Sequence, residues 1–413
     1  MEIIIQKFGG TSLATPESRR QAAHVVSGTV AKGFRVVVVV SAMGRKGDPY
    51  ATDTLLSILA AEGVSEAQGA VPGREADLLM ACGEIIAATL FVSLLEKKGI
   101  PAVALTGAQA GIITNHNYGC AHILRVVPDR IKTILAEEKV AVVTGFQGRT
   151  EDGEITTLGR GGSDTSAVAI GAALQASRVE IFTDVSGLMT ADPRLAQDAK
   201  VIKQVTYQEV AELAHLGAKV IHPRAVEIAM AAGIEVWVKG LESDSEGTLI
   251  TGGPNNGVEI SGDQLVTGIA QIGGVAQIRV GLRPNIPAGR QQLAIFSGLA
   301  QPGISVDLIN VFPDFVAFTV AERDLETADQ ILRQLGYAPE LRGGFAKVSA
   351  VGAGMRGVPG VMARIVQALS DAGVEIYQSA DSHANISCLV RVDQLEKAIS
   401  ALHTEFDLAG TGF

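Results

Sequence analysis

The stretch LGRGGSDTSA, residues 158–167, decides the fold of this chain. It combines three glycines, Arg160, Asp164 and several hydroxyl side chains, and the apolar run AVAIGAALQA at 167–176 follows it directly. Glycines let a backbone approach an anion closely, and free N–H groups at the start of a helix favour negative charge. The pattern predicts a strand-to-helix junction that binds an anion. The alternative is a plain turn in which Ser163 caps the helix.

A second glycine-rich loop lies near the N-terminus. The apolar run EIIIQ at 2–6 predicts a buried strand, and KFGGTS at 7–12 follows it. Lys7 precedes the glycines, so this is not a Walker loop, yet backbone amides and one lysine suit a phosphate in a similar way. Two such loops in one chain favour phosphate binding over a purely structural role.

Composition bounds the class of protein. A chain of 413 residues is expected to form two or three domains. Its net charge of −10 and its 4% of aromatic residues argue against nucleic acid and anionic membranes as partners. The three cysteines show no spacing typical of a metal site or disulfide framework, and the longest apolar run, VVVVV at 36–40, is too short to span a bilayer. With no signal peptide at the N-terminus, we expect a cytoplasmic protein.

Strand-like runs alternate with amphipathic helices up to about residue 250, and many of these runs are apolar throughout. This pattern is typical of a mainly parallel sheet covered by helices. Several runs end in glycine- or hydroxyl-rich turns, and ligands bind at such carboxyl ends in open α/β sheets. We expect residues 45–74 to form a loop-rich excursion over the site. The predicted strands are IIIQKF (3–8), RVVVVVSA (35–42), AVALTG (102–107), KVAVVTGF (139–146), VEIFTD (179–184) and IEVWVKG (234–240).

The C-terminal part contains an internal repeat. A stretch rich in Gly, Ser, Asn and acidic residues at 242–263 indicates a domain boundary. Beyond it, IFSGLAQPGISVDLI at 295–309 is similar to IVQALSDAGVEIYQS at 365–379, so that Gly303 matches Gly373 at an offset of 70 residues. Each copy reads as helix, glycine turn, strand, strand and helix. The sequence therefore predicts two βαββαβ units.

The chain resembles the aspartate kinase (aspartokinase) family over essentially its whole length, through seven motifs that occur in order. The C-terminal repeat resembles the tandem ACT domains of this family. SAMGRKGDPYATD at 41–53 and QSADSH at 378–383 resemble the diaminopimelate-sensitive, monofunctional type. The seven motifs are KFGGTS (7–12), VVVVSAMG (37–44), CGE (82–84), GFQG (145–148), LGRGGSDTSA (158–167), FTDVSGLMTADPR (182–194) and GAKVIHPRA (217–225).

The resemblance implies transfer of the ATP γ-phosphoryl group to the side-chain carboxylate of L-aspartate, the first step towards diaminopimelate, lysine, threonine and methionine. It implies an α/β amino-acid kinase fold, with a mainly parallel sheet sandwiched by helices, followed by two ferredoxin-like ACT domains. We expect a catalytic domain at 1–245, a linker at 246–264, and ACT domains at 265–342 and 343–413. As an alternative, the C-terminal segment of the chain completes the first ACT domain.

Phosphoryl transfer requires positioning and positive charge around the γ-phosphoryl oxygens. We assign that charge to Lys7, with Asp164 as the second catalytic residue. Mg²⁺ is expected to accompany ATP, and no carboxylate cluster predicts a metal site without the nucleotide. The family positions that would contact ATP are Lys7, Gly9, Gly10, Ser12, Thr183, Asp184, Arg194 and Lys219. An alternative for Asp192-Pro193 is a simple turn, and His222 is expected to be structural.

Aspartate requires an arginine fork for a carboxylate and an acidic group for its ammonium. Arg160 suits the fork, and Asp164 is suited either to hold the ammonium or to organise the site around the reacting carboxylate. For Glu84 the alternative is a carboxylate at a helix N-terminus. The resemblance implies that the aspartate-binding residues are Ser41, Thr52, Glu84, Arg160 and Ser163.

The ACT resemblance implies an amino-acid effector, which we expect to be meso-diaminopimelate, with lysine or threonine as alternatives. The predicted effector residues are Asp307 in one loop, and Ser379, Asp381 and Ser382 in another. A homo-oligomer formed through the ACT domains is expected by analogy. One departure is Lys239, which stands where many relatives have arginine.

Two rival functions remain open. Another amino-acid kinase, acting on glutamate, acetylglutamate, carbamate or a nucleotide, would use the same phosphate-binding loops. A catalytically inactive amino-acid sensor would need only the ACT repeat, and Lys7, Glu84, Arg160 and Asp164 argue against it.

Overall fold

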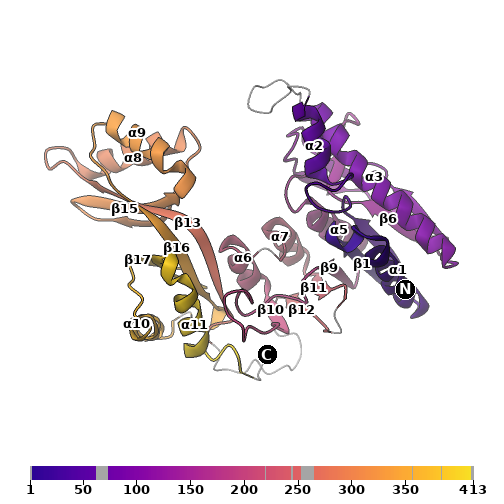
Figure 1. Ribbon diagram of the computed structural model, residues 1–413. Coiled ribbons are helices and arrows are strands. Elements are labelled where there is room, and N and C mark those ends of the chain that lie inside the picture. The colour runs from indigo at the N-terminus through magenta and orange to yellow at the C-terminus, as the bar shows by residue number, and fades with distance from the viewer. Residues whose placement is uncertain are drawn as a thin grey trace. The chain divides into compact units, whose positions relative to one another are not determined.

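The computed structural model describes residues 2–61, 73–218, 220–242, 245–252, 265–355, 357–382 and 384–410. The chain divides into two compact units, each described here by itself (Figure 1). The first comprises Met1–Leu188, Val201–Ala214 and Lys219–Val258, and the second comprises Met189–Lys200, His215–Ala218 and Glu259–Phe413.

The described residues of the first unit form an eight-stranded sheet in the order β10-β12-β11-β9-β1-β2-β6-β3. Neighbouring strands run parallel except for the antiparallel pair β11 and β12. The predicted mainly parallel sheet is therefore confirmed. Val36 to Val40 in β2 are all buried, which explains their unbroken apolar run. The strands are β1 (Ile3–Phe8), β2 (Arg35–Val40), β3 (Ala102–Leu105), β6 (Val140–Thr144), β9 (Arg178–Thr183), β10 (Gln204–Thr206), β11 (Glu235–Gly240) and β12 (Thr248–Thr251).

Helices pack on both faces of this sheet. Helices α1 and α3 share a core with Phe8 and Phe182 on one face. Helix α5 covers the other face so closely that a Cβ at Gly171 would lie 2.8 Å from the Val179 side chain, and α7 packs beside α5. The helices are α1 (Pro16–Ala31), α2 (Thr52–Ala61), α3 (Gly73–Lys97), α4 (Asp129–Ala136), α5 (Gly162–Leu174), α6 (Tyr207–His215) and α7 (Pro223–Ala232), with a short 3₁₀ helix η1 (Thr11–Leu13).

Two predictions for this unit need correction. Residues 45–74 were expected to be loop-rich, but α2 occupies Thr52–Ala61 and α3 begins at Gly73, while 62–72 lie outside the described residues. The linker predicted at 246–264 contains β12, which pairs with β11 and β10, so the sheet continues past residue 245. Gly247 adopts φ +85°. The short strand TLIT, which follows it and is rich in β-branched residues, was not predicted because it lies in a glycine-rich segment.

Of the helices that the structure describes, α3 alone is long and apolar enough to cross a membrane by length and composition. The sequence prediction missed it because it considered only unbroken apolar runs. It is a core helix of the first unit. Ala87, Phe91 and Leu95 are buried against the sheet, and the same helix buries the charged residues Asp77 and Glu84.

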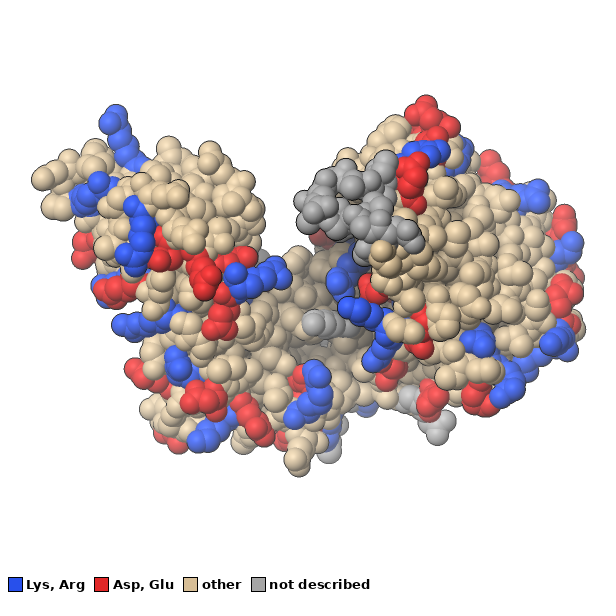
Figure 2. Space-filling model, turned by 45° about the horizontal axis from the view of Figure 1, so that its top comes forward, with Lys and Arg blue, Asp and Glu red and all other residues tan. Residues whose placement is uncertain are grey.

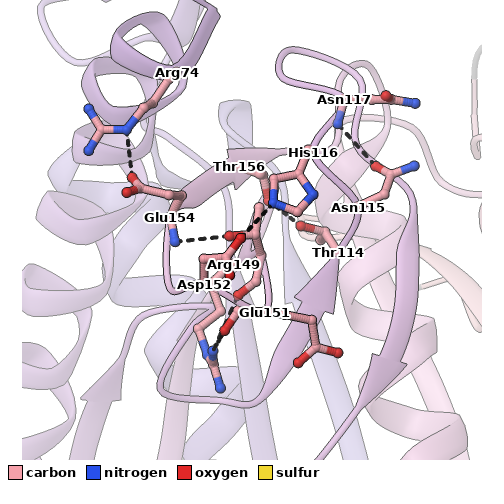
Figure 3. A network of polar contacts seen from close by, with 11 residues as sticks. Arg74, Thr114, Asn115, His116, Asn117, Arg149, Glu151, Asp152, Glu154 and Thr156 are labelled. Carbon is pink, nitrogen blue, oxygen red and sulfur yellow. Dashed lines mark hydrogen bonds and ion pairs between the residues drawn. The ribbon is translucent and has the colours of Figure 1, made fainter.

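A smaller sheet, ordered β5-β4-β7-β8, packs beside the main one and is fixed to α3. The Asp77 carboxylate accepts hydrogen bonds from the Gly119 N–H, the Thr157 N–H and the Thr157 hydroxyl. Figure 3 shows a second attachment, in which Arg74 of α3 reaches Glu154, and a nearby pair between His116 and Asp152. The strands are β4 (Ile112–Thr114), β5 (Ile123–Val126), β7 (Gln147–Arg149) and β8 (Ile155–Thr157).

The described part of the second unit is built on a six-stranded antiparallel sheet ordered β14-β15-β13-β16-β18-β17. The predicted repeat is present at its predicted offset: β15 and β18 are 70 residues apart, and Gly303 and Gly373 both have positive φ. The elements are β13 (Gly268–Gly281), α8 (Ala288–Ala300), β14 (Asp307–Val311), β15 (Phe315–Ala321), α9 (Leu325–Gln334), β16 (Glu340–Val351), α10 (Val361–Asp371), β17 (Gln378–Asp381), β18 (Asn385–Arg391) and α11 (Leu395–Glu405).

The two repeats share the long strands β13 and β16. Ile278 in the second half of β13 packs with α8 and α9 in the first core, whereas Ile269 in the first half packs with α10 and α11 in the second core. The halves meet at an irregularity next to Gly274, whose φ is +68°. The second repeat therefore takes a strand from upstream of the first. The C-terminal helix α11 packs in the second core, not the first as the sequence had allowed.

The segment Met189–Lys200 belongs to the second unit although it lies between β9 and β10 in sequence. Ala191 and Ala196 are buried in the second core. The Ile269 N–H donates to the Thr190 carbonyl at 2.7 Å, and the Thr190 hydroxyl is hydrogen-bonded to Nε2 of His403 on α11 at 2.9 Å. This short segment is thus held by both main-chain and side-chain contacts.

The surface carries both signs of charge. On the face drawn in Figure 2, basic and acidic side chains are interspersed within each unit. This distribution agrees with the modest net charge of −10 and gives that face no extended basic surface of the kind nucleic acid requires.

The division of β13 between two cores can be tested with two substitutions on one strand. Ile269→Ala and Ile278→Ala each remove a buried side chain and should lower the free energy of unfolding by about 2–5 kcal/mol. Amide hydrogen exchange should increase in α10 and α11 for Ile269→Ala, and in α8 and α9 for Ile278→Ala. The same pattern of exchange in both variants would contradict the shared strand.

Candidate functional site

The carboxyl ends of β1, β9 and β11 surround a cavity of about 400 Å³ in the first unit. Three residues predicted to contact ATP, namely Ser12, Thr183 and Asp184, line it together with Thr11 and Gly240. Sheet topology explains this convergence, because adjacent parallel strands end at the same edge. The structure thus brings together residues that lie more than 170 positions apart in sequence.

The loop after β1 has little free space around its backbone. The Gly9 N–H donates to the Phe182 carbonyl at 3.3 Å, and the Ser12 hydroxyl donates to the same carbonyl at 3.4 Å. A Cβ on Gly10 would lie 2.7 Å from the carbonyl oxygens of both Ala42 and Gly44. Gly10 is therefore required where the β1 loop and the loop after β2 cross.

Lys7 and Asp164 connect the two glycine-rich loops. The Lys7 ammonium lies 2.7 Å from the Asp164 carboxylate, with only 12% and 13% of the two side chains exposed. Lys7 reaches this position because side chains alternate along β1: Phe8 faces α1 and α3, while Lys7 faces α5. Asp164 lies in the first turn of α5, where the helix dipole favours a carboxylate.

The junction before α5 depends on two glycines in the left-handed region. Gly159 and Gly161 have φ values of +73° and +71°, and a Cβ on Gly161 would lie 2.2 Å from the His222 side chain. The plain turn capped by Ser163 is not what forms, because Gly161 is the capping residue and no side chain caps this helix. His222 caps the start of α7 instead, as expected of a structural residue.

Arg160 and Ser163 occupy different surroundings on this junction. Ser163 is buried, and its side chain lies against Gly145 of the GFQG motif. Arg160 is exposed, and within the described ranges no carboxylate forms an ion pair with it. Arg160 precedes Asp164 by four residues, and its guanidinium is suited to an incoming carboxylate.

Glu84 is the most perturbed acid of the first unit. It is 1% exposed, and burial raises the pKa of its carboxyl to about 8. Oε1 accepts a hydrogen bond from the Ala42 N–H at 3.0 Å, but Oε2 has no partner among the residues that the structure describes. The alternative of a helix N-terminal carboxylate is wrong, since Glu84 lies in the middle of α3. A buried oxygen without a partner is unfavourable in an empty protein and indicates a ligand contact.

The remaining residues predicted to bind aspartate border the same region. Ser41 directly follows β2, where its N–H donates to the Phe8 carbonyl at 3.1 Å. Its neighbour Ala42 provides the N–H bound by Glu84. Thr52 is half-buried at the first position of α2. These contacts tie the loop after β2 to both β1 and α3.

The nucleotide side contains a residue that the sequence did not single out. The Thr183 hydroxyl donates to the Asp184 carboxylate at 3.0 Å, and the Arg45 guanidinium forms an ion pair with the same carboxylate. Arg45 comes from SAMGRKG, so this motif contributes a charge at the cavity edge. The available signal was its position directly after Gly44, in the loop that follows β2.

The predicted ATP contacts Lys7, Gly9 and Gly10 lie at the end of β1 but do not line this cavity, and two further ones are not placed there. Arg194 belongs to the second unit, where its exposed guanidinium pairs with Asp192 at 2.7 Å and holds the pKa of that carboxyl below its usual range. Asp192-Pro193 forms a turn, as the alternative interpretation held, in which the Arg194 N–H donates to the Asp192 carboxylate. Lys219 lies outside the described residues.

Lys239, which stands where many relatives have arginine, forms an ion pair. Its ammonium lies 3.0 Å from the buried carboxylate of Glu180, which also binds Arg178 and accepts a hydrogen bond from Gln6 at 2.8 Å. Lys239 is thus held within a polar network between β1, β9 and β11. Neither Gln6 nor Glu180 was predicted, although each is a polar residue within an otherwise apolar strand.

The predicted effector residues make separate local contacts in the second unit. Asp307 forms an ion pair with the buried Lys347, and the Ser382 hydroxyl accepts a hydrogen bond from Asn385 at 2.8 Å. Ser379 is half-buried on β17, and Asp381 is exposed at the end of that strand.

Comparison with known proteins agrees with this geometry. Residues 2–240 match the model of the amino acid kinase family, and residues 340–404 match an ACT domain model. The structure is similar to that of Escherichia coli aspartokinase III in complex with aspartate and ADP, with a TM-score of 0.77 and 26% identity over 98% of this chain and 99% of that one. It is also similar to the same enzyme in complex with lysine and aspartate, with a TM-score of 0.76 and 27% identity over 98% and 100% of the chains.

Sequence similarity extends over the whole length. The chain is 48% identical to aspartokinase 1 of Bacillus subtilis over 412 residues, which cover 99% of this chain and 100% of that protein. It is 41% identical to an aspartokinase of Geobacillus stearothermophilus over 99% and 98% of the two chains. At this identity over essentially the whole of both proteins, the chain belongs to the aspartokinase family.

Proposed function

We propose that the carboxyl edge of the eight-stranded sheet is the active site and that its two halves separate nucleotide from acceptor. The reaction is that of an aspartokinase: the γ-phosphoryl group of ATP passes to the side-chain carboxylate of L-aspartate, giving 4-phospho-L-aspartate and ADP. This is the first step of a branched route of amino-acid biosynthesis. The observation that carries the assignment of the site is the Lys7–Asp164 pair, which joins the two glycine-rich loops beside the cavity.

On the nucleotide half, Ser12, Thr183 and Asp184 would contact ATP from the walls of the cavity. The absence of side chains at Gly9 and Gly10 would let the backbone of the β1 loop approach its phosphates closely. Arg45 holds the Asp184 carboxylate in place. Arg194 and Lys219 stay predictions from the family motifs. Mg²⁺ would arrive with ATP and neutralise its phosphates.

On the acceptor half, the Arg160 guanidinium would hold a carboxylate of aspartate with two parallel hydrogen bonds. The unpartnered Oε2 of Glu84 would receive the ammonium group, which compensates the buried charge. Ser41, Thr52 and Ser163 would supply hydroxyl contacts around them. The acceptor carboxylate is already ionised at neutral pH, so no general base is needed.

Lys7 and Asp164 act at the boundary between these halves. Asp164 orients the ammonium of Lys7 before substrates bind. As the bond between the β–γ bridging oxygen and γ-phosphorus breaks and the new oxygen–phosphorus bond forms, charge on the γ-phosphoryl oxygens is stabilised by Lys7. Because the ion pair is largely buried, this charge is preorganised and does not have to be reoriented during the reaction.

The second unit is proposed to regulate the enzyme. Its ACT repeats would bind an amino-acid effector, with meso-diaminopimelate favoured by the subtype motifs and lysine or threonine as alternatives. Regulation requires that the effector bind active and inactive states with different affinity. We further propose a cytoplasmic homo-oligomer associated through the ACT domains, in which the enzyme is the monofunctional, diaminopimelate-sensitive type.

The first test is the role of Lys7. The wild-type enzyme should release ADP with L-aspartate, and not with glutamate, acetylglutamate or carbamate, in a coupled assay. Lys7→Ala should lower kcat by roughly 10²–10³, whereas Lys139→Ala, at the opposite end of the same sheet, should leave it unchanged. Since Lys7→Ala leaves Asp164 without its partner, we expect Lys7→Ala/Asp164→Ala to regain thermal stability but not turnover. Near-normal kcat in Lys7→Ala would remove Lys7 from the mechanism.

The second test is the assignment of Arg160 to the acceptor. Arg160→Lys keeps the positive charge but loses the planar fork, so kcat/KM for aspartate should fall by about 10-fold or more. Initial rates measured against each substrate separately should show little change in KM for ATP. A selective loss of ATP affinity would assign Arg160 to the nucleotide instead.

The third test uses the raised pKa of Glu84. The unfolded chain ionises this carboxyl near its ordinary value of 4.5, while the folded enzyme retains the proton up to about pH 8. The resulting stabilisation is present in full below pH 4.5 and is lost as pH rises to 8. The free energy of unfolding of the wild type should therefore fall by on the order of 3 kcal/mol between pH 5 and 8, and Glu84→Gln should not show this fall.

Denaturant unfolding without ligands measures this change, and the exposed Glu75 on the same helix provides the control Glu75→Gln. In the kinetic counterpart, kcat/KM for aspartate should rise with pH between 6 and 8 and become flat in Glu84→Gln. An unaltered stability profile in that variant would show that Glu84 does not titrate in this range.

A further inference from the structure

Arg45 carries a positive charge to the edge of the nucleotide cavity. It directly follows Gly44 in the loop after β2, and the Gly44 N–H donates to the Gly10 carbonyl at 2.9 Å. This hydrogen bond fixes the loop against the glycine-rich turn that follows β1. From there the Arg45 guanidinium extends to the carboxylate of Asp184, which lines the cavity. Arg45 therefore lies between the β1 loop and the cavity wall.

The main chain that carries Arg45 is held by several contacts. Gly44 adopts φ +89°, and a Cβ there would lie 2.3 Å from the Asp48 carboxylate. The same carboxylate accepts a hydrogen bond from the Arg45 N–H at 2.7 Å, and the Asp48 N–H donates to the Arg45 carbonyl at 2.9 Å. The Gly47 N–H donates to the Thr54 hydroxyl of α2 at 3.0 Å. The backbone of Arg45 is thus fixed, while its exposed side chain can change rotamer.

The described lining of the cavity is acidic. Its charged members are Asp184 and Glu242, and none of the lining residues that the structure describes is a lysine or an arginine. A nucleotide polyphosphate would meet like charge there unless cations approach it. Lys7 provides one cation, but its ammonium is paired with Asp164 on the side of the sheet that α5 covers. Arg45 provides a second cation, which already contacts one of the two lining carboxylates.

The ion pair between Arg45 and Asp184 is suited to exchange. Their side chains are 70% and 49% exposed, and ion pairs in such a setting contribute little to stability because water screens them. The Thr183 hydroxyl donates to the other carboxylate oxygen of Asp184 at 3.0 Å, so the carboxylate keeps a partner when the arginine leaves. Phosphate oxygens can accept two parallel hydrogen bonds from a guanidinium, and a polyphosphate carries more charge than a carboxylate.

We propose that Arg45 is a further ATP-binding residue, which changes its partner when the nucleotide binds. In the free enzyme its guanidinium pairs with Asp184. In the complex it turns to the phosphate oxygens of ATP, and the released carboxylate accepts hydrogen bonds from hydroxyl groups of the nucleotide. This inference rests on the proposed nucleotide half of the active site. It adds to that half a residue that the sequence did not single out.

The test measures nucleotide affinity in the full-length enzyme. Isothermal titration with ADP and Mg²⁺ should show that Arg45→Gln raises the dissociation constant about 10-fold or more. Arg45→Lys should give an intermediate value, because it keeps the charge but loses the planar fork. In both variants KM for ATP should rise, while KM for aspartate stays at the wild-type value. The control is Arg125→Gln, which also removes an exposed arginine from an ion pair in the first unit and should leave ADP affinity unchanged.

A second substitution separates a direct contact with phosphate from an effect exerted through Asp184. If Arg45 binds phosphate, Arg45→Gln should weaken ADP binding at least as much in an Asp184→Asn background as in the wild type. If Arg45 only orients the Asp184 carboxylate, its loss should have no further effect once that carboxylate is replaced. The second result would overturn the proposal.

The thermal unfolding temperature should stay at the wild-type value in every variant, which verifies that they fold. Unchanged ADP affinity in Arg45→Gln, together with weakened affinity in Asp184→Asn, would overturn the role of Arg45 and leave the nucleotide cavity intact. Unchanged affinity in both variants would overturn the role of Arg45 together with the proposed nucleotide half.

Discussion

The ion pair between Lys7 and Asp164 is the interaction on which the first unit is organised. It joins the end of β1 to the start of α5, two elements separated by more than 150 residues in sequence. The pair can form only because Gly159 and Gly161 turn the chain sharply before α5 and because Gly10 permits the loops after β1 and β2 to cross. A buried pair contributes little net stability, so its retention is better explained by a preorganised charge at the site than by folding alone.

Glu84 extends the same principle to the acceptor. A carboxyl buried in the middle of α3, with one oxygen bonded to Ala42 and the other without a described partner, is unfavourable until a cation reaches it. Polar groups that are incompletely satisfied in the free protein can make binding energy available to a ligand that satisfies them. In the proposed site, the protein therefore maintains a paired cation at Lys7 and an incompletely hydrogen-bonded carboxyl group at Glu84, one for each substrate.

Much of this arrangement follows from local patterns in the sequence. The unbroken apolar strands predicted the parallel sheet, the glycine-rich turns indicated the ligand edge, and the match of Gly303 to Gly373 predicted the repeat. Other features depend on distant contacts that no local pattern encodes. The division of β13 between two cores, the Arg45–Asp184 pair and the inclusion of 189–200 in the second unit are decided by packing partners far away in the chain. The linker predicted at 246–264 was wrong, because β12 is short and lies among the polar residues from which the linker was inferred.

The shared strands of the second unit also bear on its ancestry. A lone copy of the second repeat would lack the outer strand that residues 268–273 now provide, and would leave a long sheet edge unpaired. Such a copy could complete itself by exchanging strands with an identical neighbour, as swapped dimers do. Gene duplication and fusion of that dimer would yield the present interleaved order in one chain. Neither half could afterwards be lost or transplanted alone, so evolution would have to keep or discard the two together.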